Sequence, residues 1–312
     1  MKRYKLIVNP VSGGGKGEKA IPLIERTLQG YGLDYALVRT ESPWHAARLA
    51  QQAAGEGYDV VVAVGGDGTA NEVLNGLMAA KEAGEGNAAM AVLCVGRGND
   101  FAFGVGIPKE LPAGCRVLAE DYRQTIDVGR VVGGLYPKGR FFGNGVGIGF
   151  DAAAGFEAQK LKHLHGFLGY FVAALKTIFL YYRAPTVRIE YNGQTLQQPS
   201  LMVSIMNGRR MGGGFMMAPR ALVHDGLLDL CIASQVSRAR IFALIPRFMK
   251  GTQASHPAIK TGRTRQITVT AVEGVLPAHA DGETLCTEGE QLALEILPRQ
   301  IQVLCEAVRT AP

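Results

Sequence analysis

A run of five apolar residues, Val60–Val64, constrains the fold more than any other segment of the sequence. Four of the five residues are valine, and an unbroken β-branched run of this kind is typical of a strand buried on both faces. A glycine-rich segment, residues 65–68, follows directly, and a helical pattern begins after it at Asn71. A doubly buried strand that leads into a helix indicates a parallel sheet with helices on its faces.

The first third of the chain alternates between strand patterns and helix patterns. We expect strands at Tyr4–Val8, Tyr35–Val38, Val60–Val64 and Met90–Val95, and helices at Ala20–Leu28, His45–Ala54 and Asn71–Lys81. Ser42 and Pro43 are expected to begin the second helix, as its N-cap and its first residue. Regular alternation of this kind predicts an N-terminal α/β domain with a doubly wound parallel sheet.

Beyond about Asp127 the pattern changes to short β-like segments separated by Gly, Pro and Asn. These segments are 141–142, 187–191, 201–206, 228–232, 266–270 and 292–296, with helical stretches at about 157–182 and 237–250. The pattern predicts a second, mostly antiparallel β domain. The 312 residues suit two domains, which we place at 1–130 and 131–312, and the last strand, about 299–312, could pack back on the first domain.

The chain carries a net charge of +6 and has a pI of about 9.1. A basic balance favours an anionic partner, such as a phosphate group or an acidic membrane face, although it also fits ordinary surface charge. No dense Lys/Arg run with interleaved aromatic residues is present, so nucleic acid is not expected as a partner. The five cysteines are widely spaced without a CxxC pair, which argues against disulfides and zinc and for a reducing, cytoplasmic compartment.

Residues 164–182 are strongly apolar, which raises the question of a membrane span. A spanning helix needs about 20 apolar residues, and here Gly166, Gly169 and Lys176 interrupt the run. We therefore expect a helix with a wide apolar face that either packs in the core or touches a bilayer surface. The second alternative would make the protein peripheral at the inner face of the membrane.

The segment Gly65–Glu72, with the sequence GGDGTANE, carries the strongest chemical signal. Glycines that open a helix expose backbone N–H groups, so a phosphate is expected on Gly66–Ala70. Thr69 and Glu72 have the spacing of a capping box. A carboxylate at Asp67 would repel phosphates unless Mg²⁺ lies between them. The alternative is that the Asp-Gly pair simply forms a tight turn.

A second glycine cluster, Gly13–Gly17 (GGGKG), lacks the spacing of a P-loop. It is either a flexible turn before a helix or a second glycine flap near phosphates, to which Lys16 would add positive charge. The sequence alone leaves both alternatives open.

Motifs in a fixed order give nearly the whole chain a resemblance to a known family. They are Asn9-Pro10 with Ser12-Gly13, the Gly65–Glu72 segment, Gly98-Asn99-Asp100-Phe101, Gly149-Phe150-Asp151-Ala152, and Gly212-Gly213-Gly214 with Pro219, Asp225-Gly226-Leu227-Leu228-Asp229 and Asp281-Gly282-Glu283. The ordered set resembles the soluble lipid-kinase family that includes bacterial diacylglycerol kinases and sphingosine kinases. The resemblance implies an N-terminal diacylglycerol kinase catalytic domain, a C-terminal β-sandwich domain for the lipid substrate, and an active site between them.

The resemblance also assigns roles to residues. It implies ATP-dependent, Mg²⁺-assisted transfer of phosphate to a hydroxyl of a lipid such as diacylglycerol, with Glu283 as the general base and Asp67 as a catalytic residue near the metal. The residues implied in ATP binding are Asn9, Pro10, Ser12, Gly13, Thr40, Gly66, Asp67, Gly68, Thr69, Ala70, Asn71 and Glu72.

A second, structural Mg²⁺ site is implied as well, and Asp127 matches an acidic position near the cleft. The residues implied in this metal site are Leu222, Asp225 and Leu227. The partner would be a lipid at a membrane surface, and a homodimer is compatible with the sequence. The methionines that would either line the lipid path or pack in the core are Met202, Met206, Met211, Met216 and Met217.

One segment departs from the family pattern. The family usually shows Pro-x-Gly-Thr-x-Asn-Asp, but this chain has Cys94 in place of the proline and Arg97 in place of the threonine. The threonine belongs to the nucleotide site of the family, so Arg97 is a further candidate for ATP binding through a charge-assisted contact to phosphate. It would alternatively crowd the site, change the nucleotide preference or mark a member of low activity.

Two other functions remain open. An NAD kinase shares the GGDGT loop and the two-domain plan, although the segments Asp225–Asp229 and Asp281–Glu283 fit the lipid-kinase pattern better. A nucleotide- or lipid-binding regulator without catalysis is the other alternative, and Arg97 is the residue that favours it.

Overall fold

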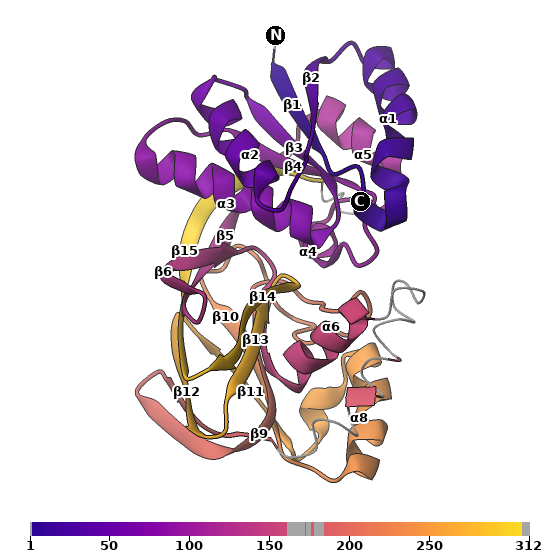
Figure 1. Ribbon diagram of the computed structural model, residues 1–312. Coiled ribbons are helices and arrows are strands. Elements are labelled where there is room, and N and C mark those ends of the chain that lie inside the picture. Colours follow the sequence, from indigo (N-terminus) through magenta and orange to yellow (C-terminus); the bar gives the residue numbers. More distant parts are fainter. Residues whose placement is uncertain (1, 161–171, 173–175, 178–183, 308–312) are drawn as a thin grey trace, which may run out of the picture. The chain divides into compact units, whose positions relative to one another are not determined.

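The computed structural model describes residues 2–160, 172, 176, 177 and 184–307 (Figure 1). Contacts within the chain divide it into two compact units. The first unit comprises the residues up to Ile126 and those from Arg299 onward, and the second comprises Asp127–Pro298. The helix expected at about 157–182 falls largely outside the described residues.

The first unit is a parallel sheet with helices on both faces. Its strands lie in the order β15–β4–β3–β1–β2, and the pairings are parallel. Its elements are β1 (Arg3–Val8), α1 (Ser12–Gly30), β2 (Asp34–Arg39), α2 (His45–Gly55), β3 (Val60–Gly65), α3 (Asp67–Ala83), β4 (Ala89–Cys94), α4 (Asp100–Gly104), α5 (Leu111–Glu120) and the end of β15 (Gln291–Leu304). Helices α2 and α3 pack together on one face, and α1 and α5 pack together on the other (Figure 1). The expected doubly wound α/β domain is confirmed.

Burial of β3 on both faces explains its apolar sequence. All six residues of β3 are buried. Val62 packs in one apolar cluster with Ile24 of α1 and Leu118 of α5. Val61 points to the opposite face because side chains alternate along a strand, and it is equally buried.

Helix α2 begins at His45, as expected, but its cap differs from the prediction. Its N-cap is Trp44, which has a left-handed φ of 63°, and Ser42 and Pro43 lie before the helix. The backbone N–H of Ala46 donates a hydrogen bond of 3.0 Å to the carboxylate of Glu72. The predicted cap was therefore wrong, because a side chain of α3 satisfies the first turn of α2 instead.

The second unit consists of antiparallel pairs. One run of strands has the order β14–β13–β7–β9–β10–β11, a second has the order β9–β8–β12–β15, and β5 pairs with β6. The elements are β5 (Arg123–Gly133), β6 (Tyr136–Phe142), β7 (Gly145–Gly149), α6 (Phe150–Lys160), β8 (Thr186–Tyr191), β9 (Gln194–Met206), β10 (Leu228–Ser234), α8 (Arg238–Lys250), η1 (Gln253–Ser255), β11 (Ile259–Thr264), β12 (Gln266–Glu273), β13 (Leu276–Ala280) and β14 (Glu283–Gly289). The expected, mostly antiparallel second domain is confirmed.

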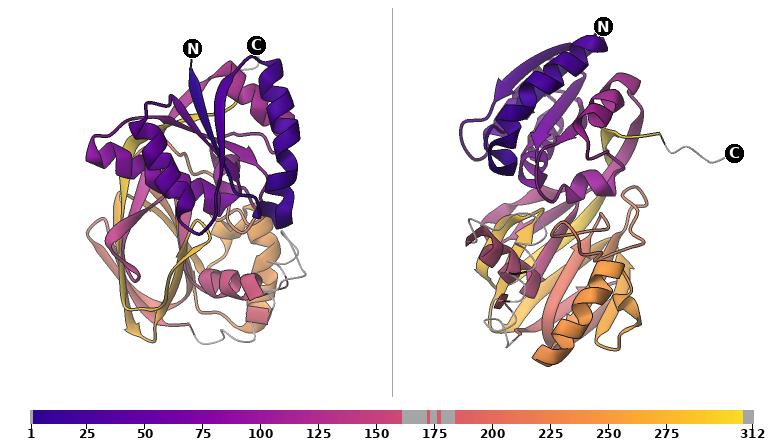
Figure 2. Two further views of the ribbon diagram at one scale, coloured as in Figure 1. Left: turned by 45° about the horizontal axis from the view of Figure 1, so that its top comes forward. Right: turned by 90° about the vertical axis from the view of Figure 1, so that its right-hand side faces the viewer.

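The pleat of β10 separates two apolar cores in the second unit. Leu230 and Ile232 point into the core that contains side chains of β8 and β12. Cys231 and Ala233 point to the other face and pack with Phe248 of α8. Figure 2 shows α8 lying against that face of the strands.

A two-residue turn, Asp281-Gly282, closes the hairpin β13–β14. Its φ values of 49° and 87° are both positive, as in a type I′ turn. The buried Asp281 carboxylate accepts hydrogen bonds from three consecutive backbone N–H groups, those of residues 143–145, at 2.8, 3.0 and 2.8 Å. One side chain therefore fixes the hairpin to the loop between β6 and β7.

We expect Asp281→Gly to destabilise the second unit, because glycine accepts a positive φ but leaves three buried N–H groups without a partner. Each such group costs about 1–3 kcal/mol, so the free energy of unfolding should fall by about 3 kcal/mol or more. Asp281→Asn should lose less, because residues 144 and 145 bond to the same carboxylate oxygen, which an amide can replace. Urea denaturation of both variants tests this, and equal losses would contradict it.

Candidate active site

The loop between β3 and α3 presents a helix N-terminus. Gly66 is the N-cap of α3 and has an extended backbone (φ −109°, ψ −163°). As a glycine, it supplies no side-chain cap to the helix. Backbone N–H groups at a helix start can bind anions, because they combine hydrogen-bond donors with the positive end of the helix dipole.

The capping box predicted for Thr69 and Glu72 was wrong. Thr69 lies inside the first turn of α3, where its Oγ1 accepts a hydrogen bond of 3.1 Å from Asn9 Nδ2. The Glu72 carboxylate instead accepts the N–H of Ala46 in α2. Both side chains thus join α3 to other elements.

The loops that follow β1, β3 and β4 are in backbone contact. The N–H of Asn9 donates to the carbonyl of Val64 at 3.0 Å, and the N–H of Gly96 donates to the carbonyl of Gly65 at 3.1 Å. A Cβ atom at Gly96 would lie 2.3 Å from the Cα of Gly66, so only glycine permits this approach. The loops meet at the carboxyl ends of parallel strands, which is where such sheets bind ligands.

The glycine cluster that follows β1 has a defined backbone. Gly13, Gly14 and Gly15 have successive φ values of 63°, 77° and 88°, and a Cβ atom at Gly13 would lie 2.2 Å from the carbonyl oxygen of Val95. A guanidinium nitrogen of the exposed Arg97 lies 3.6 Å from the position of a Cβ atom at Gly14. Arg97 therefore lies along this loop and adds positive charge to it.

Other residues predicted to hold a nucleotide lie at the same edge of the sheet. Thr40 follows β2, and its N–H donates to the carbonyl of Val8 at 2.8 Å. Ser12 Oγ lies 3.8 Å from the position of a Cβ atom at Gly66. The remaining members follow β1 or lie in the first turns of α3: Asn9, Pro10, Gly13, Asp67, Gly68, Thr69, Ala70, Asn71 and Glu72.

Two carboxylates converge beside the N-terminus of α3. Asp67 Oδ1 accepts the N–H of Phe101 at 3.0 Å. A Cβ atom at Gly98 would lie 2.8 Å from Asp67 Oδ2 and 3.4 Å from Asp100 Oδ2, so both side chains face this glycine. Carboxylate oxygens are ligands that Mg²⁺ prefers in proteins. Asp100 was not among the predicted site residues, although its Asn-Asp motif was the signal that could have found it.

Gly96→Ala should push apart the loops that follow β3 and β4. We expect a loss of about 1–3 kcal/mol of stability, typical of overpacking, and weaker nucleotide binding. Gly55→Ala is the matched control, because its Cβ atom would meet no heavy atom closer than 3.9 Å. Calorimetric titration with an ATP analogue and thermal unfolding measure both effects. Nucleotide binding by Gly96→Ala at wild-type affinity would contradict the role given to this contact.

Glu283 is the first residue of β14, directly after the Asp281-Gly282 turn. It pairs with Ala280 across the hairpin, and its side chain is exposed. Within the described part of the chain, its carboxylate has no hydrogen bond or ion pair. The hairpin therefore presents this carboxylate from a rigid support.

Asp225, predicted to bind a second metal, has a different cationic partner. Arg263 of β11 hydrogen-bonds to Asp225 Oδ2, and its Nε lies 3.5 Å from Asp229 Oδ2. The other oxygen of Asp225 accepts the N–H of Leu227 at 3.2 Å. No group of three or more His, Cys, Asp or Glu side chains that could hold a metal exists among the described residues. A metal at Leu222, Asp225 and Leu227 would have to compete with this guanidinium for the carboxylate, and the metal site stays a prediction.

Two more carboxylates, those of Asp127 and Asp229, contact the loop that carries Asp225 or the arginine that is paired with it. Asp127 is fully buried, and its Oδ2 accepts the N–H of Gly226 at 2.6 Å. Burial raises the pKa of Asp229, which the charge of Arg263 opposes. Asp127 thus fixes the loop that carries Asp225.

Arg263→Gln should create a dependence of stability on divalent cations, because Asp225 and Asp229 would lose their counter-charge. We expect the Tm to fall by about 2–4 °C, equivalent to about 1 kcal/mol for a unit of this size, and millimolar Mg²⁺ to restore part of it. Arg265→Gln, at an exposed position two residues away, is the control. A Tm of Arg263→Gln that is unaffected by Mg²⁺ would show that these carboxylates need no cation.

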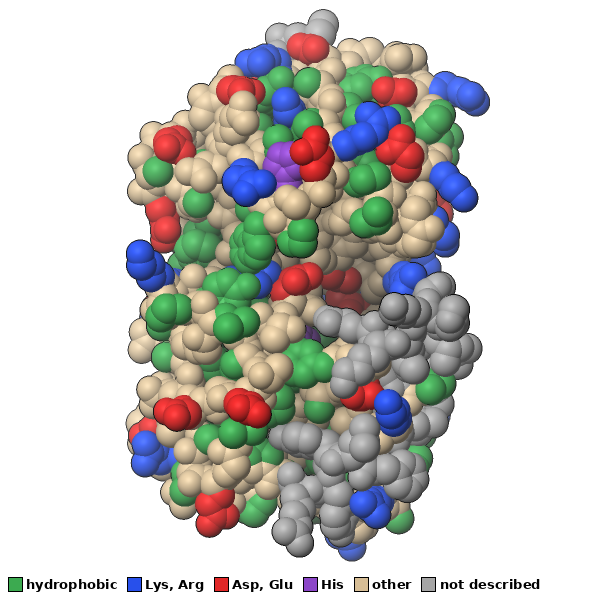
Figure 3. Space-filling model, in the orientation of Figure 1, with side chains coloured by type: hydrophobic (Ala, Val, Ile, Leu, Met, Phe, Trp, Pro, Cys, Tyr) green, Lys and Arg blue, Asp and Glu red, His purple; other side chains and the backbone are tan. Residues whose placement is uncertain are grey.

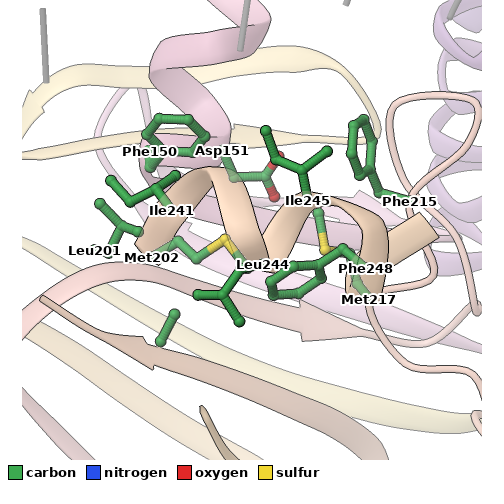
Figure 4. Close-up of a pocket in the computed structure, with 11 residues that line it drawn as sticks. Phe150, Asp151, Leu201, Met202, Phe215, Met217, Ile241, Leu244, Ile245 and Phe248 are labelled. Atoms are coloured by element: carbon green, nitrogen blue, oxygen red, sulfur yellow. The ribbon is translucent and has the colours of Figure 1, made fainter. Parts of the chain in front are cut away.

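An apolar pocket lies within the second unit, between α8 and the sheet (Figure 4). It has about 50 Å³ of space open to a water-sized molecule, and α8 contributes Ile241, Leu244 and Phe248 to its wall. Met202 of β9 and Met217 also line it. Of the other candidate methionines, Met206 and Met211 are packed in the adjacent core and Met216 is half-buried, so the stretch divides between pocket and core. The apolar segment 164–182 is outside the described residues except at 172, 176 and 177.

Two family matches together span nearly the whole chain. The diacylglycerol kinase catalytic domain matches residues 3–131, and the YegS C-terminal NAD kinase beta sandwich-like domain matches residues 144–305. The chain belongs to the diacylglycerol kinase family of lipid kinases. It is a phosphotransferase with an alcohol group as acceptor, and the resemblance drawn from its motifs is confirmed.

Individual relatives cover the same length of this lipid kinase. A diacylglycerol kinase of Mycobacterium tuberculosis (strain CDC 1551 / Oshkosh) is 26% identical over 299 residues, which are 96% of this chain and 93% of the relative. The structure of a candidate diacylglycerol kinase from Bacillus anthracis strain Sterne has a TM-score of 0.80 at 22% identity and covers 98% of this chain and 95% of that one. An NAD kinase from Archaeoglobus fulgidus in complex with ATP has a TM-score of 0.52 at 13% identity, with coverages of 97% and 93%. The two structures show the fold.

The surface of the kinase carries mixed charge on the face drawn in Figure 3, where acidic and basic side chains of the first unit are interspersed. None of the described helices is long and apolar enough to cross a membrane.

Proposed function

We propose that the protein is an ATP-dependent kinase that phosphorylates a hydroxyl group of a lipid such as diacylglycerol. The observation that carries the proposal is the glycine start of α3, beside which the loops after β1, β3 and β4 approach so closely that Gly13 and Gly96 leave no room for a side chain, in a chain of the lipid-kinase family. The triphosphate of ATP would lie on Gly66–Ala70, beside the Gly13–Gly15 loop and Arg97. Phosphoryl transfer requires mainly positioning and charge neutralisation, and these groups supply both.

Asp67 and Asp100 would hold the Mg²⁺ that accompanies ATP. Support for this comes from their convergence on Gly98 and from the oxygen donors that they offer. When bound, Mg²⁺ neutralises phosphate charge. The hydrogen bond from the N–H of Phe101 orients Asp67 for this task.

Glu283 would accept the proton of the lipid hydroxyl. Support comes from its exposure, from the lack of a partner among the described residues, and from the turn that fixes the start of β14. A general base needs such an available carboxylate within hydrogen-bond reach of the acceptor.

The hydrocarbon part of the substrate would enter the apolar pocket beside α8. Its wall is almost entirely apolar, which suits an acyl chain, and helix α8 would have to move to admit one, because the pocket has only about 50 Å³ of open space. Met202 and Met217 can adapt to chains of different shape. The enzyme would act in the cytoplasm, at the inner membrane face where its lipid substrate resides, as a monomer or a homodimer and without nucleic acid.

A regulator without catalysis is the second candidate, because Arg97 lies against the first glycine loop in place of the family threonine. The guanidinium of Arg97 would bind a nucleotide but restrict the movement of that nucleotide. NAD kinase activity is less well supported, because the family match at the N-terminus is to diacylglycerol kinases.

Transfer of the γ-phosphate of ATP to lipids in mixed micelles tests the proposal. Labelled lipid should form with the wild type and Mg²⁺, and Glu283→Gln should reduce kcat by about 10²-fold or more, the scale of a general base. Glu288→Gln is the matched control, because Glu288 is an exposed glutamate of the same strand. Asp67→Ala should abolish the Mg²⁺-dependent reaction.

The outcomes separate the candidate functions. Nucleotide binding without transfer to any lipid would support the regulator. Transfer to NAD but not to lipid would support an NAD kinase. Unchanged activity of Glu283→Gln would remove this residue from the base role and leave the kinase assignment in place.

A further inference from the structure

A buried polar cluster lies on the face of the β13–β7–β9 sheet that packs against α6. It consists of Asp151 in the first turn of α6, Ser204 of β9 and His279 of β13. Their exposed fractions are 1%, 0% and 5%. Charged and polar groups this deeply buried destabilise a fold unless they are paired, so the cluster needs either a structural or a functional reason.

The pleat of the sheet and one glycine bring the three side chains together. Neighbouring residues of β9 and β13 point into the opposite core, whereas Ser204 and His279 point towards α6. Gly147 of β7 lies between them. A Cβ atom at Gly147 would be 2.4 Å from Asp151 Oδ2 and 2.7 Å from His279 Nε2, so the cluster exists only because this residue has no side chain.

The hydrogen bonds of the cluster define the state of His279. The backbone N–H of Gly282 donates to His279 Nδ1 at 3.3 Å, so this nitrogen carries no proton. The ring proton is therefore on Nε2, which lies 3.8 Å from Asp151 Oδ1. Ser204 Oγ donates to the other oxygen of Asp151 at 3.5 Å. Asp151 thus favours the tautomer of His279 in which Nδ1 carries no proton and accepts the hydrogen bond from Gly282.

The cluster connects two parts of the proposed active site. Asp151 lines the apolar pocket beside α8, where its carboxylate is seen among Phe150, Ile241 and Ile245 (Figure 4). At the other end of the cluster, His279 accepts a hydrogen bond from the N–H of Gly282, and Gly282 directly precedes Glu283. A continuous path of contacts therefore runs from the pocket wall to the turn that presents Glu283.

We propose that Asp151, in the wall of the pocket, and His279 are positioning residues that hold the Glu283 carboxylate in place. The proposal rests on the kinase function and base role proposed above. Asp281 anchors the first residue of the turn through residues 143–145, and His279 anchors the second. Gly282 has no side chain and a φ of 87°, so without the bond to His279 its backbone gains conformational freedom. Glu283 would then leave the geometry that proton transfer needs.

Two variants of His279 separate positioning from general packing. In Asn the side-chain oxygen has the same distance along the chain as Nδ1, so His279→Asn can still accept from Gly282 but cannot reach Asp151. In Gln the terminal amide corresponds to Nε2, so His279→Gln can reach Asp151 but offers nothing to Gly282. Both remove the aromatic ring, and their Tm values should therefore be similar.

We expect His279→Gln to lower kcat for lipid phosphorylation by at least about 10-fold, the effect of a small misplacement of a catalytic group, with the KM for ATP unchanged. His279→Asn should keep kcat within about 3-fold of the wild type, since the turn keeps its bond. Hydrogen exchange of the Gly282 amide, followed by NMR, should accelerate in His279→Gln and not in His279→Asn. This readout does not depend on activity.

A second comparison tests Asp151. Asp151→Leu removes the carboxylate that fixes the His279 tautomer, so it should lower kcat in the wild-type background. In the His279→Asn background the same change should have a smaller effect, because asparagine has no tautomer to fix. Additive effects in this cycle would exclude the connection through His279.

The failure of this inference is distinguishable from the failure of the proposed function. If wild-type activity is present and sensitive to Glu283→Gln, but His279→Asn and His279→Gln have equal kcat and equal Gly282 exchange, the cluster is structural and the inference is wrong. If the wild type phosphorylates no lipid, or if Glu283→Gln is fully active, the proposed function or the base role fails and the inference fails with it.

Discussion

Backbone contact between glycines at the ends of β3 and β4 is the constraint on which the first unit depends. A Cβ atom at Gly96 would lie 2.3 Å from the Cα of Gly66, so the two loops can approach this closely only without a side chain at position 96. This approach brings the carboxylates of Asp67 and Asp100 to the same side of Gly98, next to the glycine start of α3. The backbone N–H groups of a helix start are hydrogen-bond donors that can bind an anion such as phosphate.

The second unit uses a missing side chain in the same way. Gly147 of β7 leaves room between sheet and helix α6 for Asp151 and His279. An apolar residue at this point would have produced an ordinary core, as it does on the opposite face of the same sheet. The unit therefore has a purely apolar side, which stabilises it, and a side where polar groups and a pocket lie beneath helices α6 and α8.

Most of the fold could be predicted because its signals are local. The four valines of β3, the period-2 pattern of β8 and the glycines after β3 each report on neighbouring residues, and they gave the two domain classes correctly. Details that involve a distant partner were missed. Glu72 has capping-box spacing, but it bonds to Ala46 of α2. The contact of Asp225 with Arg263 of β11 likewise has no signal in the sequence around either residue.

The sequence by itself determined the two domain classes and the chemical types of residue at the loop ends, because periodicity and glycine conformation act over a few residues. Its ordered motifs indicated the family. Only the tertiary structure decided which carboxylates have partners and which do not. Asp151 and His279 are far apart in the chain, and no local sequence pattern at either residue predicts their contact. Their meeting depends on strand register and on the absence of a side chain at Gly147, and register is set by long-range pairing, which no local pattern specifies.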